Sequence, residues 1–353
     1  MSDTKTEAQR SSLEVAQEHA LILTQALPWV KALAGKTIVI KYGGAAMVDE
    51  TLRASVMEDI MLMKLVGARP VIVHGGGKDI SALVEKLGLP VEFKNGLRVT
   101  TPEVMRVVSM VLSGKVNEEL VLALNAHGNL AVGLSGVDGS MVHCEIADPS
   151  VGLVGSVKMV DPELVNQLCD KGYIPVIASV GIGPEGQAVN VNADTFASAL
   201  AQTCNASKII FLTDVDGLYR DFSDKSSLIS RLTAADAQAL VDSGTLSKGM
   251  IPKVRAVLDA IDGGVERAHI LNGTVEHSLV LELFTDCGVG TMIARTEADL
   301  HRHDILSRVK RTVVNKSHAY GADCGKACGY IRIAAAASLN DTFEMGELPW
   351  AKL

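Results

Sequence analysis

The sequence predicts an α/β protein, a three-layer α/β/α sandwich around a central, mostly parallel sheet. Short runs rich in β-branched residues alternate with longer helical patterns along most of the chain. This alternation favours a parallel sheet that helices cover on both faces. The predicted strands are 37–41, 70–74, 130–134, 174–178, 208–213 and 267–271, with a glycine-rich hairpin over 181–190. The predicted helices are 12–27, 46–66, 79–87, 102–127, 161–171, 194–203, 234–243 and 250–263.

Length and composition exclude several classes of protein. The 353 residues suggest about two domains or one large α/β unit, and 48% hydrophobic residues are ample for a core. A formal net charge of -8 without a Lys/Arg cluster argues against a nucleic-acid surface. Cys324 and Cys328 lack the spacing of a zinc site. No signal segment or membrane span is recognisable, so we expect a cytoplasmic protein.

Two predicted strands end in glycines. The first, 37–41, carries Lys41 near its end and is followed by Gly43 and Gly44. The second, 70–74, runs directly into three glycines that begin with Gly75 and Gly76. Glycines let the backbone approach a ligand closely, and a following helix start offers N–H groups to anions. Either motif alone can be a tight turn, but the two together favour a clamp around a phosphate chain.

Further polar residues follow in loops and at helix starts. Arg98 lies in a predicted loop, where it is either a solvated charge or a bidentate carboxylate ligand. Asn190, Asn192 and Asp194 alternate, which places three polar side chains on one face of an extended segment. Asp194 can also cap the next helix. Lys253 lies near the start of a predicted helix, where an anionic ligand would relieve its conflict with the helix dipole.

The amino-terminal helix, 12–27, precedes the first strand and has no evident place in a sheet-based core. Its apolar residues recur near helical spacing, and Pro28 is expected to end or kink it. Either the helix packs on its own domain, or its apolar stripe meets another subunit. The stripe consists of Leu13, Ala16, Ala20, Leu23 and Leu27.

These motifs together resemble the amino acid kinase family. The resemblance rests on the order and spacing of six motifs and covers roughly residues 12–294. The motifs are Lys41-Tyr42-Gly43-Gly44, His74-Gly75-Gly76-Gly77, Asn95-Gly96-Leu97-Arg98-Val99-Thr100, Asn190-Val191-Asn192-Ala193-Asp194, Leu212-Thr213-Asp214-Val215-Asp216-Gly217 and Gly249-Met250-Ile251-Pro252-Lys253.

In detail, the chain is similar to the members that phosphorylate the γ-carboxylate of N-acetyl-L-glutamate with ATP in arginine biosynthesis. No dedicated carboxylate cluster for Mg²⁺ is recognisable in these motifs. We therefore expect Mg²⁺ to be bound by the nucleotide phosphates and to keep its waters. Two alternatives remain open from the residues. The chain could be a carbamate or acidic amino acid kinase of the same family, or a non-catalytic sensing homologue.

The resemblance also implies roles for individual residues. The expected catalytic residues are Lys41, Lys253, Asp194, Gly44 and Gly76. The expected substrate-binding residues are Gly75, Gly76, Arg98, Asn190 and Asn192. The expected ATP-binding residues are Lys41, Gly43, Gly44, Asp214, Val215, Gly217 and Lys253.

We divide the chain accordingly into four parts. Residues 1–34 form a helical extension, and 35–205 form a lobe for N-acetyl-L-glutamate binding and phosphoryl transfer. Residues 206–298 form a lobe for ATP, and 299–353 form an appended tail of unknown role. The extension and the second lobe resemble the arginine-inhibited branch of the family, which implies L-arginine binding near Glu282 and Gly288. It also implies a homo-oligomer, a hexamer made as a trimer of dimers.

Overall fold

The structure is a computed structural model that describes residues 12–44, 47, 49–247, 249–285 and 288–301. The expectations for the amino-terminal 1–11 and for 302–353, with Cys324 and Cys328, lie outside these residues. None of the described helices is long and apolar enough to cross a membrane.

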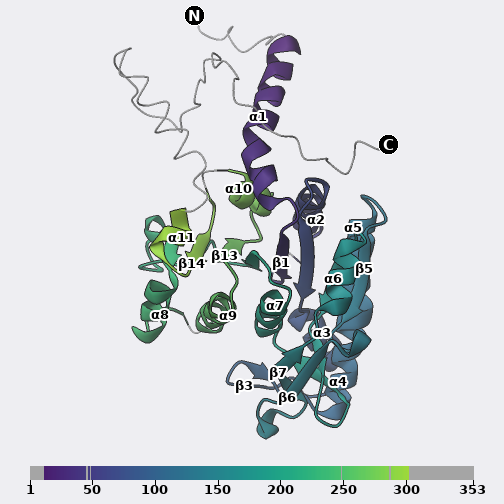
Figure 1. The fold of residues 1–353 in the computed structure, drawn as a ribbon. Coiled ribbons are helices and arrows are strands. Elements are labelled where there is room, and N and C mark those ends of the chain that lie inside the picture. Colours follow the sequence, from purple (N-terminus) through teal and green to yellow (C-terminus); the bar gives the residue numbers. More distant parts are fainter. Residues whose placement is uncertain (1–11, 45–46, 48, 248, 286–287, 302–353) are drawn as a thin grey trace, which may run out of the picture. The chain divides into compact units, whose positions relative to one another are not determined.

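An eight-stranded sheet forms the centre of the described chain, in the order β12-β14-β13-β11-β1-β2-β8-β5. Figure 1 labels its strands β14, β13, β1 and β5. All neighbouring strands run parallel except β13 and β14, which confirms the mostly parallel sheet. The strands are β1 Thr37–Tyr42, β2 Arg69–His74, β5 Ala131–Ser135, β8 Ile174–Ala178, β11 Lys208–Thr213, β12 Arg231–Thr233, β13 Arg267–Asn272 and β14 Thr291–Ala294.

Both faces of this sheet are covered, because successive strand residues enter two separate cores. In β1, Val39 belongs to one hydrophobic cluster, whereas Ile38 and Ile40 belong to the other. The helices α6 Glu163–Asp170, α7 Ala193–Thr203, α8 Ala234–Asp242 and α9 Ile251–Asp262 contribute to the first. The second cluster includes residues of α2 Glu50–Leu65, α3 Gly77–Lys86, α4 Pro102–Ser109, α5 Asn117–Asn125 and α10 Ser278–Phe284. The predicted three-layer sandwich is therefore confirmed.

The sheet is continuous across the predicted boundary near residue 205. Strand β1 pairs with β2 on one side and with β11 on the other. The amino-terminal and carboxyl-terminal halves of the described chain thus share one sheet.

Smaller strands lie outside the main sheet. Strands β6 Val142–Ile146, β7 Val154–Val160, β9 Val180–Ile182 and β10 Ala188–Val191 close into a small barrel. The antiparallel pairing of β9 with β10 confirms the predicted hairpin. A second hairpin joins β3 Phe93–Lys94 to β4 Leu97–Arg98. Its turn residues, Asn95 and Gly96, both have positive φ, as a two-residue hairpin turn with the twist of the strands requires.

The helix predicted over 102–127 is interrupted. Between α4 and α5 the backbone widens into a π-helix, Met110–Val116. Asn117 follows directly, and its side chain reaches the sheet, where Nδ2 donates to the Val176 carbonyl at 2.9 Å. Insertions of this kind re-aim the side chains that follow them. Helical periodicity alone does not reveal such an insertion, so the prediction of one regular helix was wrong.

The amino-terminal helix, α1 Ser12–Leu33, is longer than predicted. Pro28 lies inside it rather than at its end. Ala16, Ala20, Leu23 and Leu27 of the apolar stripe are exposed, and Leu23 is 71% exposed. These four side chains therefore do not pack on the described chain. The carboxyl end of α1 lies beside α10, and the two helices are in contact (Figure 1). A final short helix, α11 Glu297–His301, spans the predicted start of the tail.

Gly133 of β5 lies where Asn117 approaches the sheet, and this contact yields a stability prediction. A Cβ at Gly133 would lie 2.1 Å from Asn117 Oδ1. We expect Gly133→Ala to lower the free energy of unfolding by about 1–3 kcal/mol, because Asn117 must move from its buried carbonyl partners.

Chemical denaturation measures this change in unfolding free energy. Gly114→Ala is the matched control, since an added Cβ there meets nothing within 4 Å. The control should be as stable as the unmodified protein or up to about 1 kcal/mol more stable, because alanine favours a helical backbone over glycine. Equal stabilities for the two variants would contradict the role of this contact.

Candidate functional site

The two glycine motifs lie side by side at the carboxyl edge of the sheet. Strands β1 and β2 are parallel neighbours, with Tyr42 opposite His74. The glycines that follow each strand therefore start from adjacent positions. The carboxyl edge of an open α/β sheet is where ligands of such folds bind.

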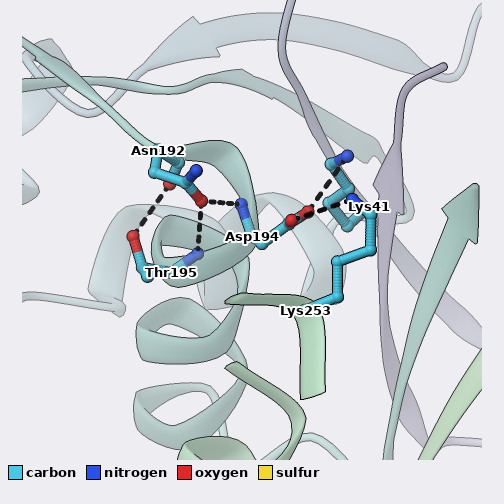
Figure 2. Close-up of polar contacts among 5 residues, drawn as sticks. All are labelled: Lys41, Asn192, Asp194, Thr195 and Lys253. Atoms are coloured by element: carbon cyan, nitrogen blue, oxygen red, sulfur yellow. Dashed lines mark hydrogen bonds and ion pairs between the residues drawn. The ribbon is translucent and has the colours of Figure 1, made fainter. Parts of the chain in front are cut away.

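Two lysines share one carboxylate at this edge (Figure 2). Lys41 Nζ lies 3.0 Å from Asp194 Oδ1, and Lys253 Nζ donates a hydrogen bond of 3.0 Å to Oδ2. Lys41 comes from β1, Lys253 from the first turn of α9, and Asp194 from the first turn of α7. The Asp194 side chain is 8% exposed, whereas Lys253 is 23% exposed.

Charge balance keeps this carboxylate ionised. Burial alone would raise the pKa of Asp194, but the charges and hydrogen bonds of Lys41 and Lys253 outweigh burial and lower it. Two cations around one anion leave a local excess of positive charge. The cluster can therefore attract a further anion, although the chain as a whole is acidic.

The helix cap beside the cluster differs from the prediction. Asn192, not Asp194, caps α7, because its Oδ1 accepts from the backbone N–H groups of Asp194 and Thr195 (Figure 2). Strand β10 ends at Val191, so the three polar residues do not share one extended face. Capping by Asn192 frees the Asp194 carboxylate for the lysines.

Gly44 brings the loop after β1 against the turn after β11. Its φ is +81°, and a Cβ there would lie 2.2 Å from Asp214 Oδ1. Only glycine combines this backbone conformation with this approach. At Gly43, a Cβ would meet Lys41 Nζ at 2.7 Å. The predicted ATP-binding residues Lys41, Gly43, Gly44 and Asp214 are thus brought together.

The rest of the Asp214–Gly217 turn packs onto β14. A Cβ at Gly217 would meet Thr291 Oγ1 at 2.4 Å, and Leu218 N–H donates to the same oxygen at 2.8 Å. Asp216 Oδ1 accepts from Asn272 Nδ2 at 2.7 Å. The turn, with Val215 inside it, is therefore held by the carboxyl-terminal half of the sheet.

The second glycine pair lies between α7 and the π-helix. A Cβ at Gly75 would be 3.5 Å from Ala193 Cβ, beside the start of α7. A Cβ at Gly76 would be 2.8 Å from Leu112 Cδ2 of the π-helix. Gly75 and Gly76 thus lie next to the helix that carries Asp194.

Arg98 is a buried cation with an unused donor. It lies in β4 rather than in a loop, and Nη2 donates to Gly77 O at 2.9 Å and to Ser81 Oγ at 2.8 Å. The guanidinium carbon lies 4.7 Å from the centre of the Phe93 ring. Nη1 is buried and, within the described residues, has no hydrogen-bond partner. Such a donor is suited to a ligand oxygen.

Asn190 links the barrel to the loop after β4. Its Nδ2 donates to Thr100 Oγ1 at 3.3 Å, and its backbone N–H donates to Leu153 O at 2.9 Å. The supporting residues Thr100 and Ser81 were not singled out from the sequence. The only sequence signal for Ser81 is its position four residues after Gly77, one helical turn along α3.

The predicted allosteric residues lie at the opposite edge of the sheet. A pocket of about 330 Å³ contains Lys36, Lys208 and Arg267, which lie at the amino ends of β1, β11 and β13, together with Glu282 and Gly288. Its walls also include Trp29 and Leu33 of α1. None of Lys41, Asp194 and Lys253 lines it, so the structure separates this pocket from the lysine cluster.

Glu282 is already partnered inside this pocket. Oε1 lies 2.7 Å from His269 Nδ1, and Oε2 accepts from Val289 N–H at 2.9 Å. Burial would raise the pKa of Glu282, but these hydrogen bonds lower it. Burial and the nearby Arg267 lower the pKa of Lys208 to about 7. The pocket thus offers charges of both signs to a small ligand.

Comparison with known proteins agrees with this geometry. The model of the amino acid kinase family matches residues 36–272. An acetylglutamate kinase of Heliobacterium modesticaldum is 49% identical over 292 residues, 79% of this chain and 99% of that protein. The acetylglutamate kinase of Caldanaerobacter subterraneus is 49% identical over 284 residues, 80% of this chain and 94% of that protein.

A solved structure shows the same fold. An N-acetylglutamate synthase from Neisseria gonorrhoeae, complexed with coenzyme A and N-acetyl-glutamate, aligns with a TM-score of 0.70. The match covers 83% of this chain and 70% of that chain at 23% identity, so it speaks for the fold alone. The family match and the identity to whole acetylglutamate kinases decide the relationship: this chain belongs to the amino acid kinase family.

Proposed function

We propose that this chain is an acetylglutamate kinase, which transfers the γ-phosphoryl group of ATP to the γ-carboxylate of N-acetyl-L-glutamate. The product is N-acetyl-L-glutamate 5-phosphate, an acyl phosphate. The similarity to acetylglutamate kinases supports this proposal, because the alignment covers 99% of the length of the Heliobacterium acetylglutamate kinase. The observation that carries the proposal is the Lys41–Asp194–Lys253 cluster between two glycine-lined strand ends.

The chemistry asks little of the protein beyond position and charge. The acceptor carboxylate is already ionised and nucleophilic, so the reaction needs no general base. Lys41 and Lys253 then neutralise the phosphoryl oxygens as charge shifts between the leaving and attacking groups. Asp194 keeps the two ammonium groups from separating. The backbone N–H groups of Gly44 and Gly76 supply further donors to the same oxygens.

Magnesium fits this site as a partner of the nucleotide rather than of the protein. Both oxygens of Asp194 already face lysines at 3.0 Å, so this carboxylate is a poor Mg²⁺ ligand. Among the described residues, no three His, Cys, Asp or Glu side chains gather into a metal site. When bound, Mg²⁺ would neutralise phosphate charge and keep most of its waters. Asp214, Val215 and Gly217 serve the nucleotide side of the site.

The other side of the site suits an amino-acid derivative. Buried Arg98 has its Nη1 donor without a partner in the described chain, which suits the α-carboxylate of N-acetyl-L-glutamate. Asn190 is connected to Arg98 by Thr100, whose hydroxyl accepts from Asn190 Nδ2 and donates to the Arg98 carbonyl. Asn190 can therefore bind a polar group of the substrate near the α-carboxylate. The side-chain oxygen of Asn192 caps α7, so only its amide NH₂ group can donate a hydrogen bond to the substrate.

A coupled assay of ADP release tests the proposal. N-acetyl-L-glutamate should be the preferred acceptor over glutamate, aspartate and carbamate, with turnover dependent on Mg²⁺ and ATP. Preference for carbamate or free glutamate would assign the chain to another branch of the family. No turnover with any acceptor would favour a non-catalytic role.

The two lysines should act mainly on turnover. We expect Lys41→Ala and Lys253→Ala each to lower kcat by roughly 100- to 1,000-fold, because each removes a charge used in the transition state. The KM for N-acetyl-L-glutamate should change much less. Lys158→Ala, which removes an exposed lysine, is the control and should leave both constants unchanged. Near-normal kcat in either site variant would contradict the assignment.

Arg98 should act mainly on substrate affinity. Arg98→Lys keeps the charge but loses the planar fork of donors. We expect the KM for N-acetyl-L-glutamate to rise roughly 10- to 100-fold, the cost of one charged hydrogen bond, with the KM for ATP nearly unchanged. Arg106→Lys, at an exposed arginine of α4, is the matched control. A similar rise in both KM values would indicate a general disturbance of the site instead.

We further propose that L-arginine inhibits this enzyme by binding in the pocket at the amino edge of the sheet. The pocket combines Glu282 with Lys208, and an amino acid needs partners of both signs. Oε1 of Glu282 keeps a lone pair beyond its contact with His269, which a guanidinium could share, whereas Oε2 already accepts from the N–H groups of Val289 and Gly290. The pocket wall includes α1, so the helix could couple the pocket to neighbouring subunits.

The exposed stripe of α1 supports exchange of this helix between dimers, which would make a hexamer as a trimer of dimers. We expect deletion of residues 1–28 to reduce the hexamer to dimers, to preserve turnover and to weaken arginine inhibition. Light scattering and arginine titrations measure both effects. Inhibition should also weaken as the pH rises above about 7, because Lys208 then loses the proton that favours the ligand carboxylate.

A point variant separates helix exchange from truncation. Leu23→Glu with Leu27→Glu places charges on the exposed stripe and should act like the deletion. Gln25→Glu adds a charge at another exposed position of the same helix and is the control. A full-length dimer that ignores arginine would contradict the proposal.

A further inference from the structure

His74 is a fully buried polar residue to which the proposed mechanism gives no role. It ends β2 and directly precedes Gly75 and Gly76. Both ring nitrogens have partners: Nδ1 lies 3.0 Å from the Gly75 carbonyl oxygen, and Nε2 lies 3.0 Å from Asn117 Nδ2. The direction of these two hydrogen bonds decides what His74 can do.

The orientation of the Asn117 amide follows from its other neighbours. The same nitrogen lies 2.9 Å from Val176 O and 3.3 Å from Leu134 O. Carbonyl oxygens only accept, so the atom that faces them must be the amide NH₂. That NH₂ therefore donates to His74 Nε2, which must be unprotonated.

The proton of the neutral ring is thus on Nδ1, where it donates to the Gly75 carbonyl. Burial lowers the pKa of His74 to about 4, although the bond to Gly75 opposes this change. The ring is neutral near pH 7. A protonated Nε2 would also face the NH₂ of Asn117, donor against donor. Both ends of the ring therefore select the same tautomer.

This hydrogen bond orients one peptide group of the glycine loop. The Gly75 carbonyl and the Gly76 N–H belong to the same peptide bond, which is trans. In a trans peptide the two groups point to opposite sides. With its carbonyl held by His74, the peptide must direct the Gly76 N–H away from the ring. Nothing in the described chain accepts a hydrogen bond from this N–H, and Gly76 is half-buried.

A peptide between two glycines needs such a restraint, because glycine permits many backbone conformations. We propose that His74 is a positioning residue, which fixes the Gly75–Gly76 peptide so that Gly76 N–H faces the transferred phosphoryl group. Asn117 selects the required tautomer, and Gly133 leaves room for Asn117. The inference rests on the proposed function through the role of Gly76.

Three substitutions at His74 separate positioning from packing. Asn places its amide nitrogen near the position of Nδ1 and can still donate to the Gly75 carbonyl. Gln reaches toward the position of Nε2 and cannot donate from the position of Nδ1, and Leu donates nothing. We expect His74→Gln and His74→Leu to lower kcat roughly 10- to 100-fold, and His74→Asn to remain within about 3-fold of the unmodified enzyme.

A purely structural role predicts the reverse order. Asn is the smallest of the three side chains, so it leaves the largest cavity and should cost the most stability. Unfolding free energies, measured beside kcat and KM, show whether activity follows packing. His127→Asn, at an exposed histidine in the turn after α5, controls for loss of a histidine. Turnover in His74→Asn as low as in His74→Leu would overturn the proposal.

A spectroscopic arm keeps this test independent of the assigned substrate. In the ¹⁵N spectrum of histidine-labelled protein, His74 should show the Nδ1–H tautomer. In glycine-labelled protein, a non-hydrolysable ATP analogue with Mg²⁺ should shift the Gly76 amide in the unmodified chain and in His74→Asn only. An Nε2–H tautomer, or the same shift in all four proteins, would overturn the inference. A wild-type protein without kinase activity would instead refute the proposed function, and these spectra would still decide the role of His74.

Discussion

The carboxylate of Asp194, held between Lys41 and Lys253, is the interaction on which the site depends. The two cations come from β1 and α9, which are far apart in the sequence. Their positive charges repel each other, so the anion between them is needed to hold them together. Removing a carboxylate from water is costly, and two lysines within 3.0 Å offset that cost. The Asp194 carboxylate therefore stays ionised, with a pKa below its usual value, although its side chain is almost fully buried.

The cluster also explains how an acidic chain can bind anionic substrates. The formal net charge of -8 gives no long-range attraction. Affinity must arise locally, from one unbalanced positive charge, from glycine N–H groups and from Arg98. Local cations of this kind act at short range, where salt screens them less than it screens surface charges.

One sheet connects two sites at its opposite edges. The lysine cluster lies at the carboxyl ends of the parallel strands, and the pocket with Glu282 lies at the amino ends of β1, β11 and β13. Six-residue strands span roughly 20 Å, so a ligand in the pocket cannot touch the reacting groups. Any influence of the pocket on catalysis must pass through the strands, the helices on the faces of the sheet, or other subunits.

Much of the fold could be predicted because the central strands are buried on both faces. Such strands appear in the sequence as near-continuous apolar runs rich in β-branched residues, and β1, β2, β8 and β11 were found at nearly their observed bounds. Strands β6, β7 and β12 were missed because they are short or partly exposed, and their apolar pattern is weak. The π-helix was missed for a related reason, since one extra residue per turn leaves no mark in a helical pattern.

The sequence by itself determined the glycine turns, the lysines near them and the family relationship, because each depends on residues close together in the chain. Tertiary structure alone decided which charges meet. Asp194 and Lys253 are 59 positions apart, and Asn192 rather than Asp194 became the helix cap. The same holds for Arg98 with Gly77 and for His74 with Asn117. Local patterns record backbone preferences, whereas these partners are chosen by how helices and strands pack, which depends on the whole chain at once.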